Sequence, residues 1–111
     1  MAVKANLIID QGSDFSKTLT VTDDNGANTD LTGFTGEGQI RKHYTSSTYT
    51  PITVSFGTPR SEGQLTLSLG RTLTANLEAG RYVYDVELTS SANTTTRLLE
   101  GVVTVTPEVT R

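Results

Sequence analysis

Side chains able to do chemistry are few and scattered in this sequence. His43 is the single histidine, and it stands beside Lys42 and Tyr44 in a segment that alternates like a strand. A serine hydrolase triad would need His43, but the chain has no Gly-x-Ser-x-Gly turn to present the serine. A zinc site built from several histidines is excluded by composition. We therefore predict a solvated His43, no catalytic residue, no cofactor and no enzymatic activity.

The densest acidic cluster lies around an Asp-Asp-Asn-Gly sequence. It contains Asp23, Asp24 and Asn25, and Asp30 follows a few residues later. The spacing does not fit an EF-hand loop, which needs oxygen ligands at alternate positions and a distal glutamate. Short polar side chains that bond their own backbone in a turn explain the cluster more simply. We predict no metal site and keep a calcium site in this loop as the alternative.

Two tyrosines bracket a short polar run in the middle of the chain. Tyr44 and Tyr49 flank residues 45–48, which read Thr-Ser-Ser-Thr, and Arg41 shortly precedes them. Exposed aromatic rings give a recognition surface both contact area and a polar end. An ordinary exposed loop is the plainer interpretation. If the chain has a partner-contact surface, we predict that Arg41, Tyr44 and Tyr49 belong to it, with a partner protein or a sugar as ligand.

Charge and composition exclude several classes of partner. The 111 residues carry 12 acidic and 9 basic side chains, a net charge of −3, whereas a general nucleic-acid binder needs a basic face. The only basic cluster, residues 41–43, divides between the two faces of a strand. The absence of cysteine suits a reducing cytoplasm. The longest aliphatic run, residues 7–9, is far too short for a leader or membrane span. From the net charge we expect no nucleic acid as a partner, and from the short aliphatic run no membrane.

Alternating hydrophobic and polar residues predict an all-β fold. In the segment 80–88, Tyr82, Tyr84, Val86 and Leu88 share one face of a strand. A polar turn and a second strand complete a hairpin that ends before Pro107, typical of the closing hairpin of an immunoglobulin-like sandwich. Further strands are predicted at residues 7–10, 15–22, 34–40, 49–56 and 64–69, with one short helical turn near 71–78. The whole chain, 1–111, is predicted to be a single immunoglobulin-like antiparallel β-sandwich domain of about seven strands.

Four positions break the simple strand pattern. Lys17 lies on the apolar side of its strand, which predicts a place at the sheet margin or beside a bulge. Gly36 and Gly38 occupy a core-facing row, which predicts a bulge or the close approach of a neighbour. Pro51 lacks a backbone donor and predicts an edge strand or a strand start. Upstream, Asn25-Gly26 is a typical hairpin turn.

Six segments spread over nearly the whole chain carry a family resemblance. They are residues 10–15 (Asp-Gln-Gly-Ser-Asp-Phe), 19–26 (Leu-Thr-Val-Thr-Asp-Asp-Asn-Gly), 30–34 (Asp-Leu-Thr-Gly-Phe), 39–42 (Gln-Ile-Arg-Lys), 77–85 (Leu-Glu-Ala-Gly-Arg-Tyr-Val-Tyr-Asp) and 98–105 (Leu-Leu-Glu-Gly-Val-Val-Thr-Val). In layout they resemble small immunoglobulin-like virion proteins of tailed bacteriophages. They are similar to the N-terminal module of phage baseplate upper proteins and of larger fibre proteins. Gly36 and Gly38 depart from that family, where bulkier residues are expected.

The resemblance implies a setting and a way of working, and no site residue. It implies a non-enzymatic structural protein of the virion, made in the bacterial host cytoplasm and placed in the tail, baseplate or neck. Such a protein docks on other virion proteins, in several copies or as a homo-oligomer, through loops and open strand edges. A capsid decoration protein of the same fold is one alternative. A carbohydrate-binding module that touches the host surface through Tyr44 and Tyr49 is another.

Overall fold

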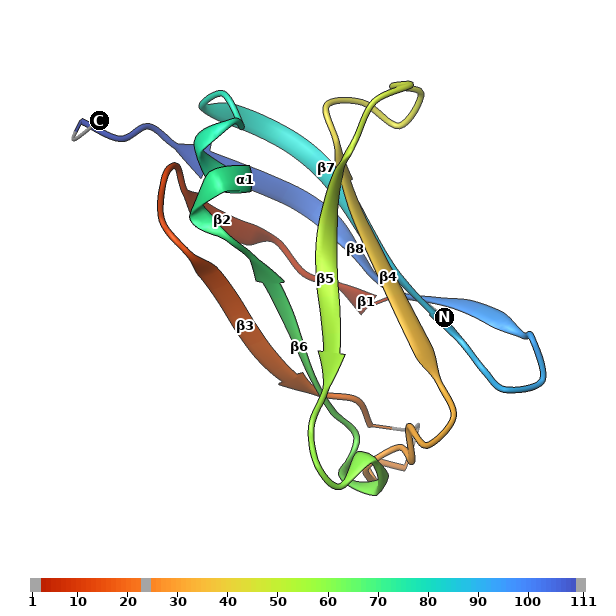
Figure 1. Ribbon diagram of the computed structural model, residues 1–111. Helices are drawn as coiled ribbons and strands as arrows, with labels where there is room; N and C mark the ends of the chain where they lie inside the picture. The colour runs from red at the N-terminus through yellow and green to blue at the C-terminus, as the bar shows by residue number, and fades with distance from the viewer. Residues whose placement is uncertain (1–2, 23–24, 110–111) are drawn as a thin grey trace.

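The computed structural model describes residues 3–22 and 25–109, and within them it contains eight strands, one short α-helix and one 3-10 turn (Figure 1). Along most of these strands, more buried and more exposed residues alternate. The elements are β1 (Val3–Lys4), β2 (Leu7–Asp10), β3 (Phe15–Thr20), β4 (Thr35–Arg41), β5 (Thr50–Phe56), η1 (Arg60–Glu62), β6 (Gln64–Leu69), α1 (Arg71–Ala75), β7 (Gly80–Thr89) and β8 (Thr95–Thr106). The predicted helical turn near 71–78 is confirmed as α1.

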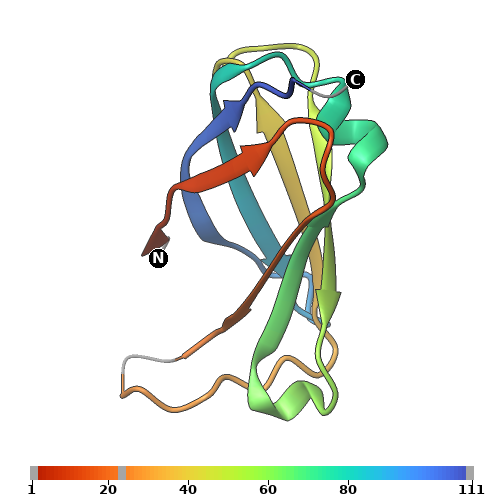
Figure 2. The same ribbon diagram turned by 90° about the vertical axis from the view of Figure 1, so that its left-hand side faces the viewer.

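The strands form a nearly closed sandwich in the order β1-β8-β7-β4-β5-β6-β3, with β2 also paired to β8. The two layers are connected by β5, which changes partner part-way along its length. Residues 50–52 pair with β4, and residues 53–56 pair with β6. In Figure 2 the layers face one another, with β2 and β8 on one side and β6 and β5 on the other. The predicted immunoglobulin-like β-sandwich is confirmed.

The N-terminal segment joins the sandwich by parallel pairing, whereas all other paired strands are antiparallel. Leu7 of β2 lies opposite Val103 of β8, and Val3 of β1 lies opposite Leu99. Between β1 and β2, the Ala5 carbonyl lies so close to Gly101 that a β-carbon there would clash with it. The twelve-residue β8 therefore carries both β7 and the N-terminal strands.

The core lies between the two layers and is built from the inward-facing residues of the alternating strands. Tyr84, Val86 and Leu88 of β7 are buried, as the sequence predicts. Tyr82 of the same row is only half-buried and packs against the edge of the core. The other buried apolar residues are Leu7, Ile9, Leu31, Ile40, Ile52, Leu65, Leu67, Leu69, Leu77, Leu99, Val103 and Val105.

The four irregular positions have the predicted physical causes. Lys17 is exposed on β3, the strand at one end of the sheet. Gly36 and Gly38 receive the side chains of Val54 and Ile52 from β5, which confirms a close approach. Pro51 is the second residue of β5 and lies opposite Gln39, in the part of β5 that pairs with β4 alone. A missing backbone donor is tolerated there because no second strand needs it.

The hairpin expected at Asn25-Gly26 is only partly present. Among the described residues around this turn, the structure has one isolated bridge, between Thr22 and Asn28, in place of two paired strands. The preceding strand β3 pairs with β6 instead, from Phe15 opposite Leu69 to Thr20 opposite Gln64. A long-range ladder that buries leucines on β6 outweighs a local turn preference. Asp23 and Asp24, predicted as part of this turn, lie outside the described residues.

Candidate functional site

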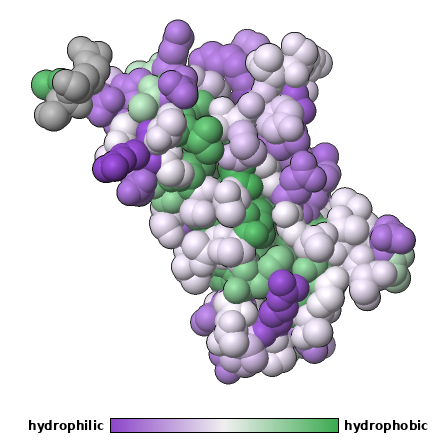
Figure 3. Space-filling model, viewed as in Figure 1, coloured by the Kyte–Doolittle hydropathy of each residue, from purple (hydrophilic) through white to green (hydrophobic). Residues whose placement is uncertain are grey.

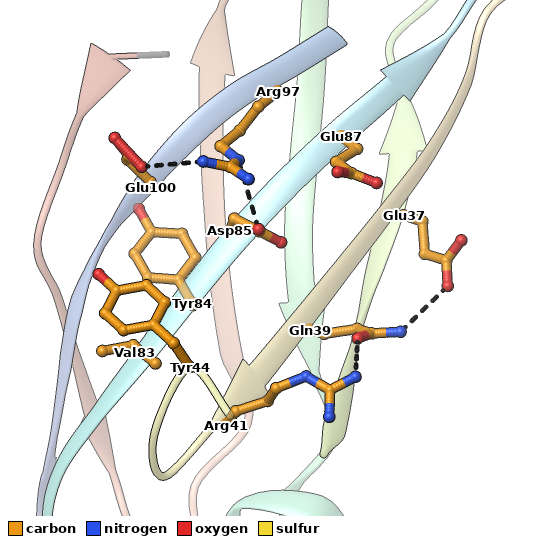
Figure 4. Close-up of a pocket in the computed structure, with 10 residues that line it drawn as sticks. All are labelled: Glu37, Gln39, Arg41, Tyr44, Val83, Tyr84, Asp85, Glu87, Arg97 and Glu100. Atoms are coloured by element: carbon orange, nitrogen blue, oxygen red, sulfur yellow. Dashed lines mark hydrogen bonds and ion pairs between the residues drawn. The ribbon is translucent and has the colours of Figure 1, made fainter. Parts of the chain in front are cut away.

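A polar depression of about 310 Å³ covers the outer face of β4, β7 and β8; we call it the outer groove (Figure 4). Most of its side chains point outward from these three strands, because alternate residues of a strand share a face, and Tyr44 joins them from the loop after β4. Its lining residues are Glu37, Gln39, Arg41, Tyr44, Val83, Tyr84, Asp85, Glu87, Arg97 and Glu100. The outer groove thus combines four carboxylates, one amide, two guanidinium groups and the exposed ring of Tyr44, whereas the Tyr84 ring is buried in the core.

Electrostatics in the outer groove centre on Arg97. Its guanidinium group lies 3.4 Å from a carboxylate oxygen of Asp85 and 3.4 Å from one of Glu100. The carboxylate of Glu37 accepts a 3.3 Å hydrogen bond from the Gln39 side-chain amide, while Glu87 lies directly opposite Glu37 on the next strand. Like charges opposite one another on paired strands repel. Only part of the acidic charge in the groove is therefore neutralised by the chain itself.

Arg41 organises the predicted contact surface. Its guanidinium group lies 4.9 Å from the centre of the Tyr49 ring, donates a 2.8 Å hydrogen bond to Gln39 and also bonds the Ser46 carbonyl. Tyr44 is 79% exposed and lies on the wall of the outer groove. Tyr49 is 51% exposed and is not among the described residues that line the groove. The structure thus brings Arg41 to both tyrosines, but only Tyr44 and Arg41 face the groove.

The rest of the basic cluster divides as the alternation predicts. His43 is exposed, and its backbone N–H donates a 3.0 Å hydrogen bond to Ser46 Oγ. Lys42 lies on the other side, where its ammonium group is 4.7 Å from the Tyr82 ring centre and bonds the Arg81 carbonyl at 3.0 Å. Lys42 therefore supports the local backbone, and these two residues do not form one basic patch with Arg41.

Tyr82 makes a contact that the sequence pattern did not reveal. Its hydroxyl donates a 2.8 Å hydrogen bond to the Glu78 carbonyl, four residues upstream at the corner entering β7. This is the tyrosine corner found in immunoglobulin-like sandwiches. Partial burial, together with the nearby Glu78 carboxylate, raises the pKa of Tyr82. A tyrosine at the start of the penultimate strand was the available signal, but the sequence interpretation assigned its side chain to the core row.

A second depression, also of about 310 Å³, lies where the sandwich fails to close; we call it the seam groove. It runs between the end strand β3 and residues of β2, β7 and β8 in the opposite layer. The lining is mostly apolar: Ala5, Leu7, Lys17, Leu19, Thr20, Val21, Thr22, Tyr84, Leu98 and Leu99. Burial raises the pKa of Tyr84, whose hydroxyl bonds the Ala5 carbonyl beside this groove.

The seam groove could not be located from sequence because one of its walls combines the N-terminal segment with Leu98 and Leu99, which lie about 80 residues from β3 along the chain. The only available signal was Lys17, a charge on the apolar row of a strand. The surface shown in Figure 3 is mainly hydrophilic or neutral in colour, and a narrow oblique band of hydrophobic residues crosses it.

Residues 3–22 and 25–109 offer neither a cluster of metal ligands nor a membrane-spanning helix. They contain no group of three or more His, Cys, Asp or Glu side chains placed to hold a metal ion. Asp30 instead accepts a 2.9 Å hydrogen bond from the Thr32 backbone N–H. Hydrogen bonds from the side chain and backbone of Thr32 lower the pKa of Asp30. None of the helices in these residues is long and apolar enough to cross a membrane.

The strand order, the strand β5 that connects the two layers, and the tyrosine corner at Tyr82 define a small immunoglobulin-like β-sandwich domain. No protein-family model matches the sequence, and no curated protein sequence matches it either. Among solved structures, it is similar to an internalin-like protein of Listeria monocytogenes, lmo2027, at 19% identity and a TM-score of 0.48, over 95% of this chain and 28% of that one. It is also similar to the sialic acid binding region of a Streptococcus sanguinis SK1 adhesin, at 18% identity and a TM-score of 0.49, over 93% and 28%. This chain therefore spans little more than a quarter of either, and the likeness concerns the fold and carries nothing about function.

Proposed function

We propose that this chain is a non-enzymatic docking component of a tailed-phage particle, placed in the tail, baseplate or neck. The observation that carries the docking role is the unpaired edge of β3. This strand pairs with β6 on one side and has no strand partner on the other within the described residues. An open edge offers backbone donors and acceptors to a strand of another protein. The phage setting rests on the resemblance of the six sequence segments.

Repetition in a particle supports the same role. Phage tails, baseplates and necks are symmetric, so each copy of a small domain meets an equivalent neighbour. A modest contact at one strand edge, repeated around a ring, gives a stable assembly without a large interface in any one copy. A capsid decoration protein would use the same contact on a different part of the particle, and remains the nearest alternative.

The particle setting is tested on virions released by the bacterium that carries the coding sequence. We expect a mass spectrum of purified virions to contain the chain in many copies, and a cryo-electron map to place its β3 edge against a neighbouring subunit. Absence of the chain from purified virions would refute both the tail and the capsid readings. A map with β3 facing solvent would refute docking through this edge.

The docking role can also be tested by blocking the edge. A Thr18→Pro variant removes a backbone donor that faces the open edge of β3, because proline has no N–H. We expect particles assembled with this variant to lose the protein, whereas Thr18→Ala, which keeps the backbone donor, should be incorporated normally. Equal incorporation of both variants would contradict docking through β3.

A second candidate function is supported by the outer groove. Tyr44 stands at the wall of a polar depression lined by Gln39 and several carboxylates, a set that can stack on a sugar ring and bond its hydroxyl groups. This favours a carbohydrate-binding module that contacts the host surface. A Tyr44→Ala variant should then lose retention on a column carrying host-surface glycans. Tyr49→Ala is the matched control, because Tyr49 lies outside the groove lining, and unchanged retention of the Tyr44 variant would exclude this function.

A further inference from the structure

The direction of the β3 backbone groups follows from one hydrogen bond. Just beyond β3, the Val21 N–H donates a 2.7 Å hydrogen bond to the Gly63 carbonyl on the β6 side. In an antiparallel ladder, alternate residues direct their backbone groups to the same side. The odd-numbered residues of β3 therefore bond β6, and Ser16, Thr18 and Thr20 direct their N–H and C=O groups to the open edge. The 3.0 Å contact between the Thr18 and Thr66 hydroxyls agrees, since such close side chains mark pairs without backbone bonds.

The seam groove lies immediately beside this edge and is shaped for the side chains of an added strand. Leu19 and Val21 form one wall, and Leu7, Leu98 and Leu99 are among the residues of the other. A strand paired to β3 would direct every second side chain into the groove, because side chains alternate across a sheet. Apolar residues at those positions would remove the exposed parts of Leu19 and Leu98 from water.

Lys17 is the one charged residue among the described lining of the seam groove. It belongs to the inward-facing row of β3, between Phe15 and Leu19, and forms no salt bridge among the described residues. A charge that points inward on an edge strand opposes pairing with an uncharged strand, since its ammonium group would lose water without gaining a partner. In an antiparallel pair of two β3 strands centred on Thr18, Lys17 would oppose Leu19 of the other copy. A second copy is therefore a poor occupant.

We propose that the seam groove and the β3 edge together bind an extended segment of a partner protein that carries alternating apolar residues and one carboxylate opposite Lys17. This proposal rests on the docking function proposed above and names the chemistry of the partner. The backbone groups of Ser16, Thr18 and Thr20 hold the segment. The apolar walls accept its inward side chains, and Lys17 selects an acidic residue over a neutral or basic one.

Two probe peptides test this selection. One is an acetylated, amidated nonapeptide of alternating valine and threonine in which the central valine is replaced by glutamate; the other has lysine at that position. In nuclear magnetic resonance titrations of the whole chain, we expect saturable shifts of the Ser16, Thr18 and Thr20 amides. The glutamate peptide should bind about fivefold more tightly, the effect of one partly exposed ion pair. A Lys17→Glu variant should reverse the preference, and Thr18→Pro should abolish the shifts while Thr18→Ala retains them.

Four other outcomes count against the proposal. Equal affinity for the two peptides, or shifts confined to another face, would overturn it. A dimer in sedimentation that Thr18→Pro disrupts would show that a second copy occupies the edge, which also overturns it. Detection of the chain in virions without peptide binding would refute this inference and leave the virion role standing. Selective peptide binding with no chain in virions would support this inference and refute the virion role.

Discussion

Gly36 of β4 and Val54 of β5 lie so close together that a β-carbon at position 36 would come within 2.5 Å of the Val54 Cγ1 atom. Two positions along β4, a β-carbon on Gly38 would lie 3.0 Å from Ile52 Cβ. This crowding occurs where β5 leaves β4 and passes to β6. The two glycines therefore make room for the strand that connects the layers, which is why the core-facing row lacks bulk there.

A Gly36→Ala substitution is predicted to destabilise the fold by about 1–3 kcal/mol, the usual cost of overpacking a core. The added methyl group must displace Val54, and the Leu88 Cδ2 atom lies 3.3 Å from the same point on the other strand partner. Chemical denaturation measures the change. A Val54→Ala substitution in the Gly36→Ala background should recover part of the loss, so a double variant as unstable as the sum of the singles would contradict the steric explanation.

A Thr74→Val substitution is predicted to cost about 0.5–1.5 kcal/mol of unfolding free energy, because it removes the hydrogen bond that a buried hydroxyl makes to Ser13. Thr74 of α1 is fully buried, and its hydroxyl donates a 2.8 Å hydrogen bond to the Ser13 carbonyl in the β2–β3 loop. Valine keeps the shape and removes the donor. Thermal unfolding monitored by circular dichroism tests this. A melting temperature equal to that of the parent would show that the contact contributes nothing.

Stability is predicted to fall as the pH rises above about 10, the pKa of tyrosine in an unfolded chain. Burial raises the pKa of both Tyr82 and Tyr84 in the folded state. Above pH 10 the unfolded chain therefore releases protons that the folded chain retains, and the folded state loses stability until its own tyrosines ionise. The double variant Tyr82→Phe with Tyr84→Phe should show a shallower decline with pH. An unchanged slope would refute a role for these two groups.

A Glu37→Gln substitution is predicted to stabilise the domain by about 0.2–1 kcal/mol at low salt. It removes the repulsion between Glu37 and Glu87 on paired strands and keeps an oxygen that accepts the Gln39 hydrogen bond. Because the contact is exposed, the gain should shrink in about 1 M salt, where charges are screened over a few ångströms. Urea denaturation at both salt concentrations measures it. A gain independent of salt would indicate a cause other than charge.

The strands and their buried faces could be predicted from the sequence because a two-residue period needs only local information. The inward rows of β6 and β7 follow directly from the positions of their leucines, valines and tyrosines. Single anomalies were informative as well. Lys17 predicted a sheet margin, and Gly36 predicted a close neighbour, since each conflicts with burial in an ordinary strand row.

Pairing between distant strands, and the grooves that depend on it, required the tertiary structure. Asn25-Gly26 predicted a local hairpin, but β3 gains more by laying its ladder on β6, some 45 residues away. Parallel addition of β2 to β8 left no trace in either segment, because the alternation of a strand does not depend on its partner's direction. The outer groove also depends on the pairing of distant strands, so the sequence could not predict that Tyr44 lines it and Tyr49 does not.

The sequence alone thus determined which residues face inward and that the fold is an immunoglobulin-like sandwich, because both follow from local alternation and turn chemistry. Only the tertiary structure decided which edge remains open and which side chains share a groove. Arg41 faces Tyr49 while Tyr44 turns to the outer groove, and Lys17 stands beside Leu98 in the seam groove, since strands from both ends of the chain meet there.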